Sequence, residues 1–164
     1  GGVSRPSPAP PGPPPRHNSI LYNAFDEQSA VDPRRPVMGR GAPVLGDEDP
    51  SLTVTTNVAL TKEQKKEFML AASSMVAAKL SKPESYVVVV VHDNVDMLWG
   101  RSDAPAALCQ LVSLGGINLE NNKAVSAEVS ALLGGFGIPA DRIYTEFRDV
   151  ARENMGYNGA TFGG

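Results

Sequence analysis

Reactive side chains are few in this sequence of 164 residues, and they limit the chemistry that it could perform. The single cysteine, Cys109, excludes an internal disulfide and a thiolate-rich zinc site. Because Cys109 lies in an apolar run, we expect a buried, inert thiol. The two histidines, His17 and His92, are too few for a multi-histidine metal centre, and His92 falls at a strand end, where a surface position is expected. The sequence therefore predicts no metal and no cofactor.

Motifs for nucleophilic and nucleotide chemistry are also absent from the sequence. No G-x-S-x-G segment occurs, and no histidine lies near a candidate nucleophile along the chain. The glycine pairs at 115–116 and 134–135 match neither the dinucleotide-binding nor the Walker pattern. The residue types alone therefore leave the function open.

Charge and hydropathy exclude two classes of partner. The chain has 15 basic and 18 acidic residues, a net charge of −3, which disfavours nucleic-acid binding through phosphate neutralisation. No apolar run approaches the ~20 residues that a membrane helix needs, so a membrane partner is not expected. No signal peptide is visible. We therefore expect a cytoplasmic protein or one secreted without such a peptide, and an extracellular location stays open.

Proline and glycine divide the chain into two regions. Ten of the 14 prolines and six glycines lie in residues 1–49, and this fraction of about one third is typical of disordered segments. We expect a disordered tail at 1–49 and one folded domain at 50–164. Residues 11–16 fit P-x-x-P-x-R, a pattern that can bind an SH3-type groove, although a solvated spacer is the plainer interpretation.

The first half of the domain has the pattern of a β-α-β unit. Residues 51–58 are rich in β-branched side chains and predict a strand. Thr61 and Gln64 match a capping box, and apolar residues at helical spacing then continue to Leu80. A second strand of five valines is predicted over residues 86–91.

The second half repeats this order of elements. We predict a strand at 107–114, a helix at 121–136 and a strand at 142–147, with a further short strand at 96–99. Pro83 and Pro139, which enter the corresponding strands, are 56 residues apart. The fold class expected is α/β (α+β): duplicated β-α-β units forming a four-stranded sheet, with two helices on one face and parallel pairing within each unit.

The valine run at 87–91 also predicts an assembly. A continuous apolar strand is normally buried on both faces, and two helices can cover only one face of the sheet. We therefore expect another copy of the protein to cover the second face. The alternative is that the tail or the C-terminal segment folds over it.

Eight fragments of the domain, in order and at the right spacing, are similar to one known family. They are residues 50–58, 81–86, 99–102, 107–109, 113–117, 138–144, 154–158 and 161–163. Together they resemble the macrophage migration inhibitory factor family of the tautomerase superfamily, over residues 50–164. The resemblance implies a homotrimer with a central channel. It also implies keto–enol tautomerisation of α-keto acids such as phenylpyruvate, or isomerisation of dopachrome-like compounds.

The resemblance also implies roles for individual residues. Pro50 matches the N-terminal proline that is the family's general base, and Lys82 matches the lysine that pairs with the substrate carboxylate. Leu114 matches the position whose backbone N–H contacts the substrate, and its side chain is expected in the core. Tyr144 matches a tyrosine that faces the pocket from the neighbouring subunit. One cysteine of the family's Cys-Ala-Leu-Cys motif is replaced by Ala106, so dithiol redox activity is not expected.

Three departures from the family pattern bear on function. Glu146 replaces an asparagine and Tyr157 replaces a tryptophan at the pocket rim, and both affect which substrate fits. Pro50 follows Asp49, so its nitrogen is an amide without a basic lone pair. The hypotheses are therefore a tautomerase once the amino group of Pro50 is free, a non-catalytic cytokine-like or scaffold trimer that displays proline-rich tails to a receptor or SH3-type partner, and a trimer with neither activity.

Overall fold

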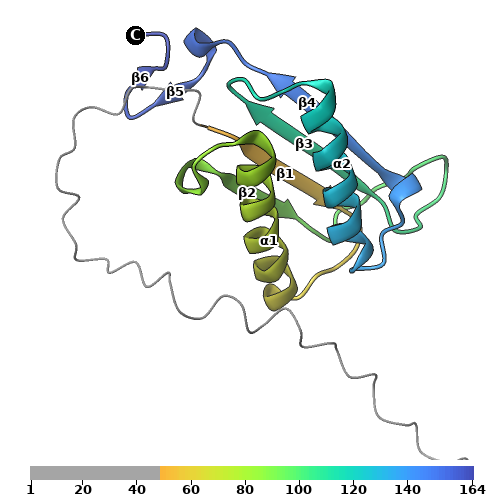
Figure 1. Ribbon diagram of the computed structural model, residues 1–164. Coiled ribbons are helices and arrows are strands. Elements are labelled where there is room, and N and C mark those ends of the chain that lie inside the picture. The colour runs from red at the N-terminus through yellow and green to blue at the C-terminus, as the bar shows by residue number, and fades with distance from the viewer. Residues whose placement is uncertain (1–48) are drawn as a thin grey trace, which may run out of the picture. The chain divides into compact units, whose positions relative to one another are not determined.

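The computed structural model describes residues 49–164, coloured from orange to blue in Figure 1. The predicted disordered tail and its P-x-x-P-x-R segment lie outside the described residues, apart from Asp49. The main elements are β1 (Ser51–Thr56), α1 (Lys62–Leu80), β2 (Val88–His92), β3 (Ala107–Ser113), α2 (Leu119–Gly134) and β4 (Ile143–Asp149). The smaller ones are the 3-10 turns η2 (Glu84–Tyr86), η3 (Ala140–Arg142) and η4 (Arg152–Asn154) and the strands β5 (Gly156–Tyr157) and β6 (Ala160–Thr161).

The four long strands form one sheet in the order β2-β1-β3-β4. β1 pairs in parallel with β2, β3 pairs in parallel with β4, and β1 pairs antiparallel with β3. Both helices cover the same face of this sheet (Figure 1). The predicted duplication of β-α-β units, with two helices on one face of four strands, is therefore confirmed.

The predicted short strand at 96–99 is wrong. Within residues 49–164 this segment makes a single bridge, in which Trp99 and Ser102 exchange both backbone hydrogen bonds. Gly100 and Arg101 between them have φ angles of +58° and +67°. The chain therefore closes on itself in a tight turn instead of extending along a neighbouring strand.

Local capping explains where the helices begin and end. The capping box at α1 is formed as predicted: Thr61 Oγ1 accepts from the Gln64 N–H, and Gln64 Oε1 accepts from the Thr61 N–H. The Asn118 side chain accepts from the Asn121 N–H, so α2 begins at Leu119 instead of 121. The second strand begins at Val88 instead of 86, because Glu84–Tyr86 first forms a 3-10 turn.

The core lies between the helices and the covered face of the sheet. Its largest fully buried apolar side chains are Phe68, Leu52, Leu111, Leu114, Leu133, Ile138, Val54, Val76, Val125 and Val129. Burial of one such side chain contributes about 1.5–3 kcal/mol, so this layer is the main source of stability. The rings of Phe68 and Phe136 meet edge to face across it, with centroids 6.3 Å apart.

The opposite face of the sheet is open within the described residues. In β2, Val89 and Val91 pack against the core, whereas Val88 and Val90 are 54% and 37% exposed. The C-terminal segment leaves both of these valines exposed, so the alternative in which that segment covers the face does not hold. Coverage by another copy of the chain stays a prediction.

Candidate active site

Pro50 lies at the start of the central strand β1. Its side chain is fully buried, and its carbonyl oxygen accepts from the Val88 N–H at 3.0 Å, which extends the parallel ladder between β1 and β2. Proline is tolerated at the first position of a strand because it need not donate there. The ring is therefore held in one orientation at the end of the sheet.

Lys82 reaches the same end of the sheet from the C-terminus of α1. Ser81 ends the helix in the left-handed conformation with a φ angle of +54°, and the Lys82 N–H then donates to the Ala77 carbonyl at 2.9 Å. This cap directs the half-buried Lys82 toward β3, where its Nζ donates to the Leu114 carbonyl oxygen at 2.6 Å. The structure thus places one cation directly after β3.

The segment after β3 presents two successive backbone N–H groups to carboxylates. The Leu114 N–H donates to Asp49 Oδ1 at 3.0 Å, and the Gly115 N–H donates to Asp149 Oδ1 at 2.9 Å. Gly115 and Gly116 have φ angles of +70° and +74°, which glycine adopts readily. The Leu114 side chain is in the core, as predicted. Chemically, this end of the sheet can bind a carboxylate.

Tyr157 approaches this end from the C-terminal hairpin of β5 and β6. Its ring meets Tyr86 edge to face at 6.2 Å and stacks on Phe162 at 6.0 Å, and the residue is 55% exposed. Tyr86 precedes Val88, the donor to Pro50, by two residues. Sequence reasoning did not single out Tyr86 or the Asp49 side chain, although the Asp49-Pro50 pair was itself a visible signal.

Tyr144 and Glu146 lie elsewhere, on the open face of β4. Together with neighbouring strands they line a hollow of about 310 Å³. Its lining residues are Thr53, Thr55, Leu108, Cys109, Gln110, Tyr144 and Glu146. Tyr144 is 66% exposed and lies against Trp99, with ring centroids 4.2 Å apart.

Glu146 is held by two side-chain donors on the open face. Its carboxylate accepts from Gln110 Nε2 at 2.8 Å and from Arg148 Nη2 at 3.1 Å. These hydrogen bonds, first that of Gln110 and then that of Arg148, lower the pKa of Glu146 below its usual value. Glu146 therefore remains a carboxylate at neutral pH.

One chain does not bring all the candidate residues together. Tyr144 pairs with Leu108, six residues before Leu114 on β3, which corresponds to roughly 20 Å along the strand. Pro50, Lys82 and Leu114 meet at one end of the sheet, with Tyr157 near them. Tyr144 and Glu146 are displaced from that end along the open face.

The remaining candidate groups are Cys109 and His92. Cys109 is buried as predicted, and this burial raises the pKa of its thiol to about 12, so the thiolate is scarce at neutral pH. His92 is exposed at the end of β2. Among residues 49–164, no three metal-binding side chains cluster, and neither helix combines the length and apolar character needed to cross a bilayer.

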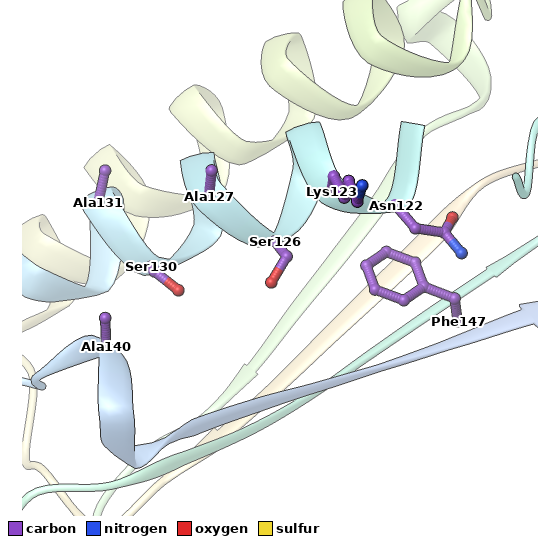
Figure 2. A pocket seen from close by; sticks show the side chains of 8 residues that line it. All are labelled: Asn122, Lys123, Ser126, Ala127, Ser130, Ala131, Ala140 and Phe147. Atoms are coloured by element: carbon purple, nitrogen blue, oxygen red, sulfur yellow. The ribbon is translucent and has the colours of Figure 1, made fainter. Parts of the chain in front are cut away.

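A second hollow, of about 730 Å³, opens along α2, away from these groups (Figure 2). Small side chains of α2 face Ala140 and the Phe147 ring across it. Its lining residues are Asn122, Lys123, Ser126, Ala127, Ser130, Ala131, Ala140 and Phe147. None of them belongs to the candidate site, so we assign this hollow no part in its chemistry.

Comparison with known proteins identifies the family. The model of the family described as macrophage migration inhibitory factor matches residues 49–163. A macrophage migration inhibitory factor homolog of Trichuris trichiura is 40% identical over 114 residues, which are 69% of this chain and 99% of that protein. The chain belongs to the macrophage migration inhibitory factor family.

Solved structures of relatives share the fold. The macrophage migration inhibitory factor of Toxoplasma gondii is 32% identical, with a TM-score of 0.66 over 68% of this chain and 99% of its own. That of Trichinella spiralis is 34% identical, with a TM-score of 0.62 over the same shares of the two chains. The matched part of this chain thus covers nearly the full length of each of these relatives.

Proposed function

We propose that this protein is a keto–enol tautomerase whose general base is the amino group of Pro50 once that group is free. The observation that carries the proposal is the meeting of Pro50, the Lys82 ammonium and the Leu114 backbone at one end of the sheet. The substrate class is a small α-keto acid or its enol, such as phenylpyruvate, and dopachrome-like compounds carry the same chemistry.

Each group has a distinct part in the proposed reaction. Lys82 and the Leu114 N–H hold the substrate carboxylate, and the Pro50 nitrogen takes a proton from the carbon next to the carbonyl. The C–H electron pair forms the C=C bond, and the carbonyl oxygen takes a proton from solvent. A free α-amino group has a pKa of about 7.7–8.0, and the adjacent Lys82 charge lowers it further. A base titrating near neutral pH contributes about 10²–10⁴-fold to the rate.

The proposed active unit is a homotrimer with a central channel. Val88 and Val90 are exposed on the open face, and Tyr144 lies roughly 20 Å along β3 from Leu114. Packing of this face against a second copy would cover the valines and bring Tyr144 and Glu146 of one subunit to the Pro50 end of another. Light scattering tests this assembly, and a monomer at micromolar concentration would contradict it.

A non-catalytic trimer is the second candidate, and one observation favours it. In the chain as it stands, the Pro50 nitrogen is the amide of the Asp49–Pro50 bond and cannot act as a base near neutral pH. Such a protein would act as a cytokine-like or scaffold trimer toward a receptor or an SH3-type partner. Three copies of the proline-rich segment on one trimer would raise avidity through effective concentration.

One assay separates the two candidates. We would measure phenylpyruvate tautomerisation by the full chain, by a chain that starts at Pro50 and by the same short chain with Pro50→Gly. We expect background activity from the full chain, turnover from the short chain that falls below the pKa of its amine, and weak turnover from the glycine version, which keeps an amine without the fixed ring. Equal turnover by the full and short chains would show that another residue is the base.

A further inference from the structure

The Leu114 backbone is engaged on both sides in the uncleaved chain. Its N–H donates to Asp49 Oδ1 at 3.0 Å, and its carbonyl oxygen accepts from Lys82 Nζ at 2.6 Å. Asp49 is half-buried and directly precedes the fully buried Pro50. A side-chain carboxylate of the chain itself thus occupies the N–H that lies beside Lys82.

A substrate carboxylate would require that same N–H group. Hydrogen bonds from a backbone N–H to a charged acceptor are stronger than those between neutral groups, and one N–H cannot serve two carboxylates well. Asp49 is also covalently joined to Pro50, so its effective concentration at Leu114 is about millimolar or higher. An external acid must therefore displace an internal competitor.

We propose that Asp49 is an internal substrate mimic that closes the carboxylate subsite of the uncleaved protein. This inference rests on the proposed function, because it concerns the subsite that the reaction would use. Hydrolysis of the Asp49–Pro50 bond by water would place a hydroxyl on the Asp49 carbonyl carbon and a proton on the Pro50 nitrogen. That single cut frees the base and releases the carboxylate from Leu114, so the two requirements for activity are met together.

The test is a binding measurement on the full chain, which needs no turnover. The ligand is 3-phenylpropanoate, a carboxylate that cannot enolise, and its affinity is read from the chemical shift of the Leu114 amide. We expect Asp49→Ala to tighten binding about 10-fold or more, since one charge-assisted hydrogen bond no longer has to be displaced. Asp49→Asn keeps an acceptor without the charge, so we expect an intermediate affinity.

Two controls isolate the carboxylate of Asp49. Asp149→Ala removes a second carboxylate from the next N–H, that of Gly115, and should leave the affinity unchanged. The neutral ligand 3-phenylpropan-1-ol should bind the Asp49→Ala and unsubstituted chains equally. Equal tightening by Asp149→Ala would assign the gain to loosening of the 114–116 turn and overturn the proposal, as would unchanged binding in Asp49→Ala or equal tightening of the alcohol.

The proposal about Asp49 and the proposed tautomerase function can each fail while the other holds. If the chain that starts at Pro50 shows no turnover while Asp49→Ala still tightens the acid, the tautomerase proposal fails and the internal mimic stands. If that chain is active while Asp49→Ala binds the acid no more tightly, the mimic is overturned and the tautomerase stands.

Discussion

The two ends of the central strand pair, β1 and β3, are closed by different kinds of side chain. At each end, a side chain beside β1 accepts a hydrogen bond from a backbone N–H beside β3. At the Pro50 end, the Leu114 N–H donates to the carboxylate of Asp49. At the far end, the Ala106 N–H donates to the side-chain amide oxygen of Asn57 at 2.9 Å, and Asn57 Nδ2 donates to the Asp103 and Ala104 carbonyls.

The buried hydroxyl groups next to these two hydrogen bonds also differ between the ends. Thr56 at the far end is fully buried, donates to the Ala106 carbonyl at 2.8 Å and accepts from the Val58 N–H at 3.1 Å. Ser113, which ends the other central strand, is also fully buried, and its hydroxyl has no hydrogen-bond partner among the described residues. A duplicated fold thus has one end whose buried hydroxyl is satisfied, with the Arg142 guanidinium donating to the Ala104 and Pro105 carbonyls, and one end that carries carboxylates and an unsatisfied hydroxyl. The latter pattern is typical of a functional site.

The largest expected change in stability comes from substituting the residues that precede the two corresponding prolines, Pro83 and Pro139. Lys82 precedes Pro83 at the Pro50 end, and its counterpart before Pro139 is Ile138, which is fully buried in the core. Ile138→Lys would bury a charge and should lower the free energy of unfolding by about 4 kcal/mol or more. Lys82→Met removes the part-buried hydrogen bond to the Leu114 carbonyl oxygen, and that loss should cost about 1 kcal/mol.

Urea unfolding of the two variants measures this asymmetry directly. Similar losses from Ile138→Lys and Lys82→Met would mean that the two positions are structurally alike, and the contrast between the ends would not hold. Lys82→Met should in addition raise the KM for phenylpyruvate more than it lowers kcat in the chain that starts at Pro50, if the lysine only binds the carboxylate.

A smaller effect is expected from the two buried hydroxyls. Thr56→Val keeps the shape of the side chain but leaves the Ala106 carbonyl and the Val58 N–H without this partner, so we expect a loss of about 2 kcal/mol. Ser113→Ala removes a buried hydroxyl that has no hydrogen-bond partner among residues 49–164, so stability should stay within about 0.5 kcal/mol or rise. Thermal unfolding in parallel checks both, and a loss for Ser113→Ala as large as for Thr56→Val would show that Ser113 is satisfied in solution.

Patterns of hydrophobicity and capping predicted the fold because they act locally. The capping box at Thr61 and the apolar spacing up to Leu80 fixed α1 to the residue. The strand at 96–99 failed because two residues with positive φ angles, Gly100 and Arg101, decide that segment, and Arg101 gives no such signal in the sequence.

The candidate site was predictable only through the family resemblance. No spacing along the chain indicates that Lys82 reaches the Leu114 carbonyl 32 residues away, or that Asp49 reaches its N–H from 65 residues away. Both contacts depend on how the sheet brings distant strand ends together. The separation of Tyr144 from Pro50 within one chain likewise follows from strand register, which pattern alone does not give.

The smallest expected effect is a change in the pKa of Glu146, and it concerns the two edge strands, of which β2 is apolar and β4 is polar on the open face. On the open face β2 presents Val88 and Val90, whereas β4 presents Tyr144 and Glu146. Gln110→Leu removes the principal donor to the Glu146 carboxylate, so the pKa of Glu146 should rise toward its usual value. Arg148→Gln removes the secondary donor and should raise the pKa less.

The sign of the linked change in stability follows from the direction of the shift. A lowered pKa in the folded state stabilises the protein above the usual glutamate pKa of about 4.3, and this contribution is lost as the pH falls through the lower pKa of Glu146. Gln110→Leu should therefore weaken the dependence of unfolding on pH within that window. Carboxyl NMR titration of both variants measures the shifts. A larger rise in the pKa of Glu146 for Arg148→Gln than for Gln110→Leu would reverse the order of the two donors. It would mean that the charge of Arg148, more than the cross-strand hydrogen bond from Gln110, lowers the pKa of Glu146.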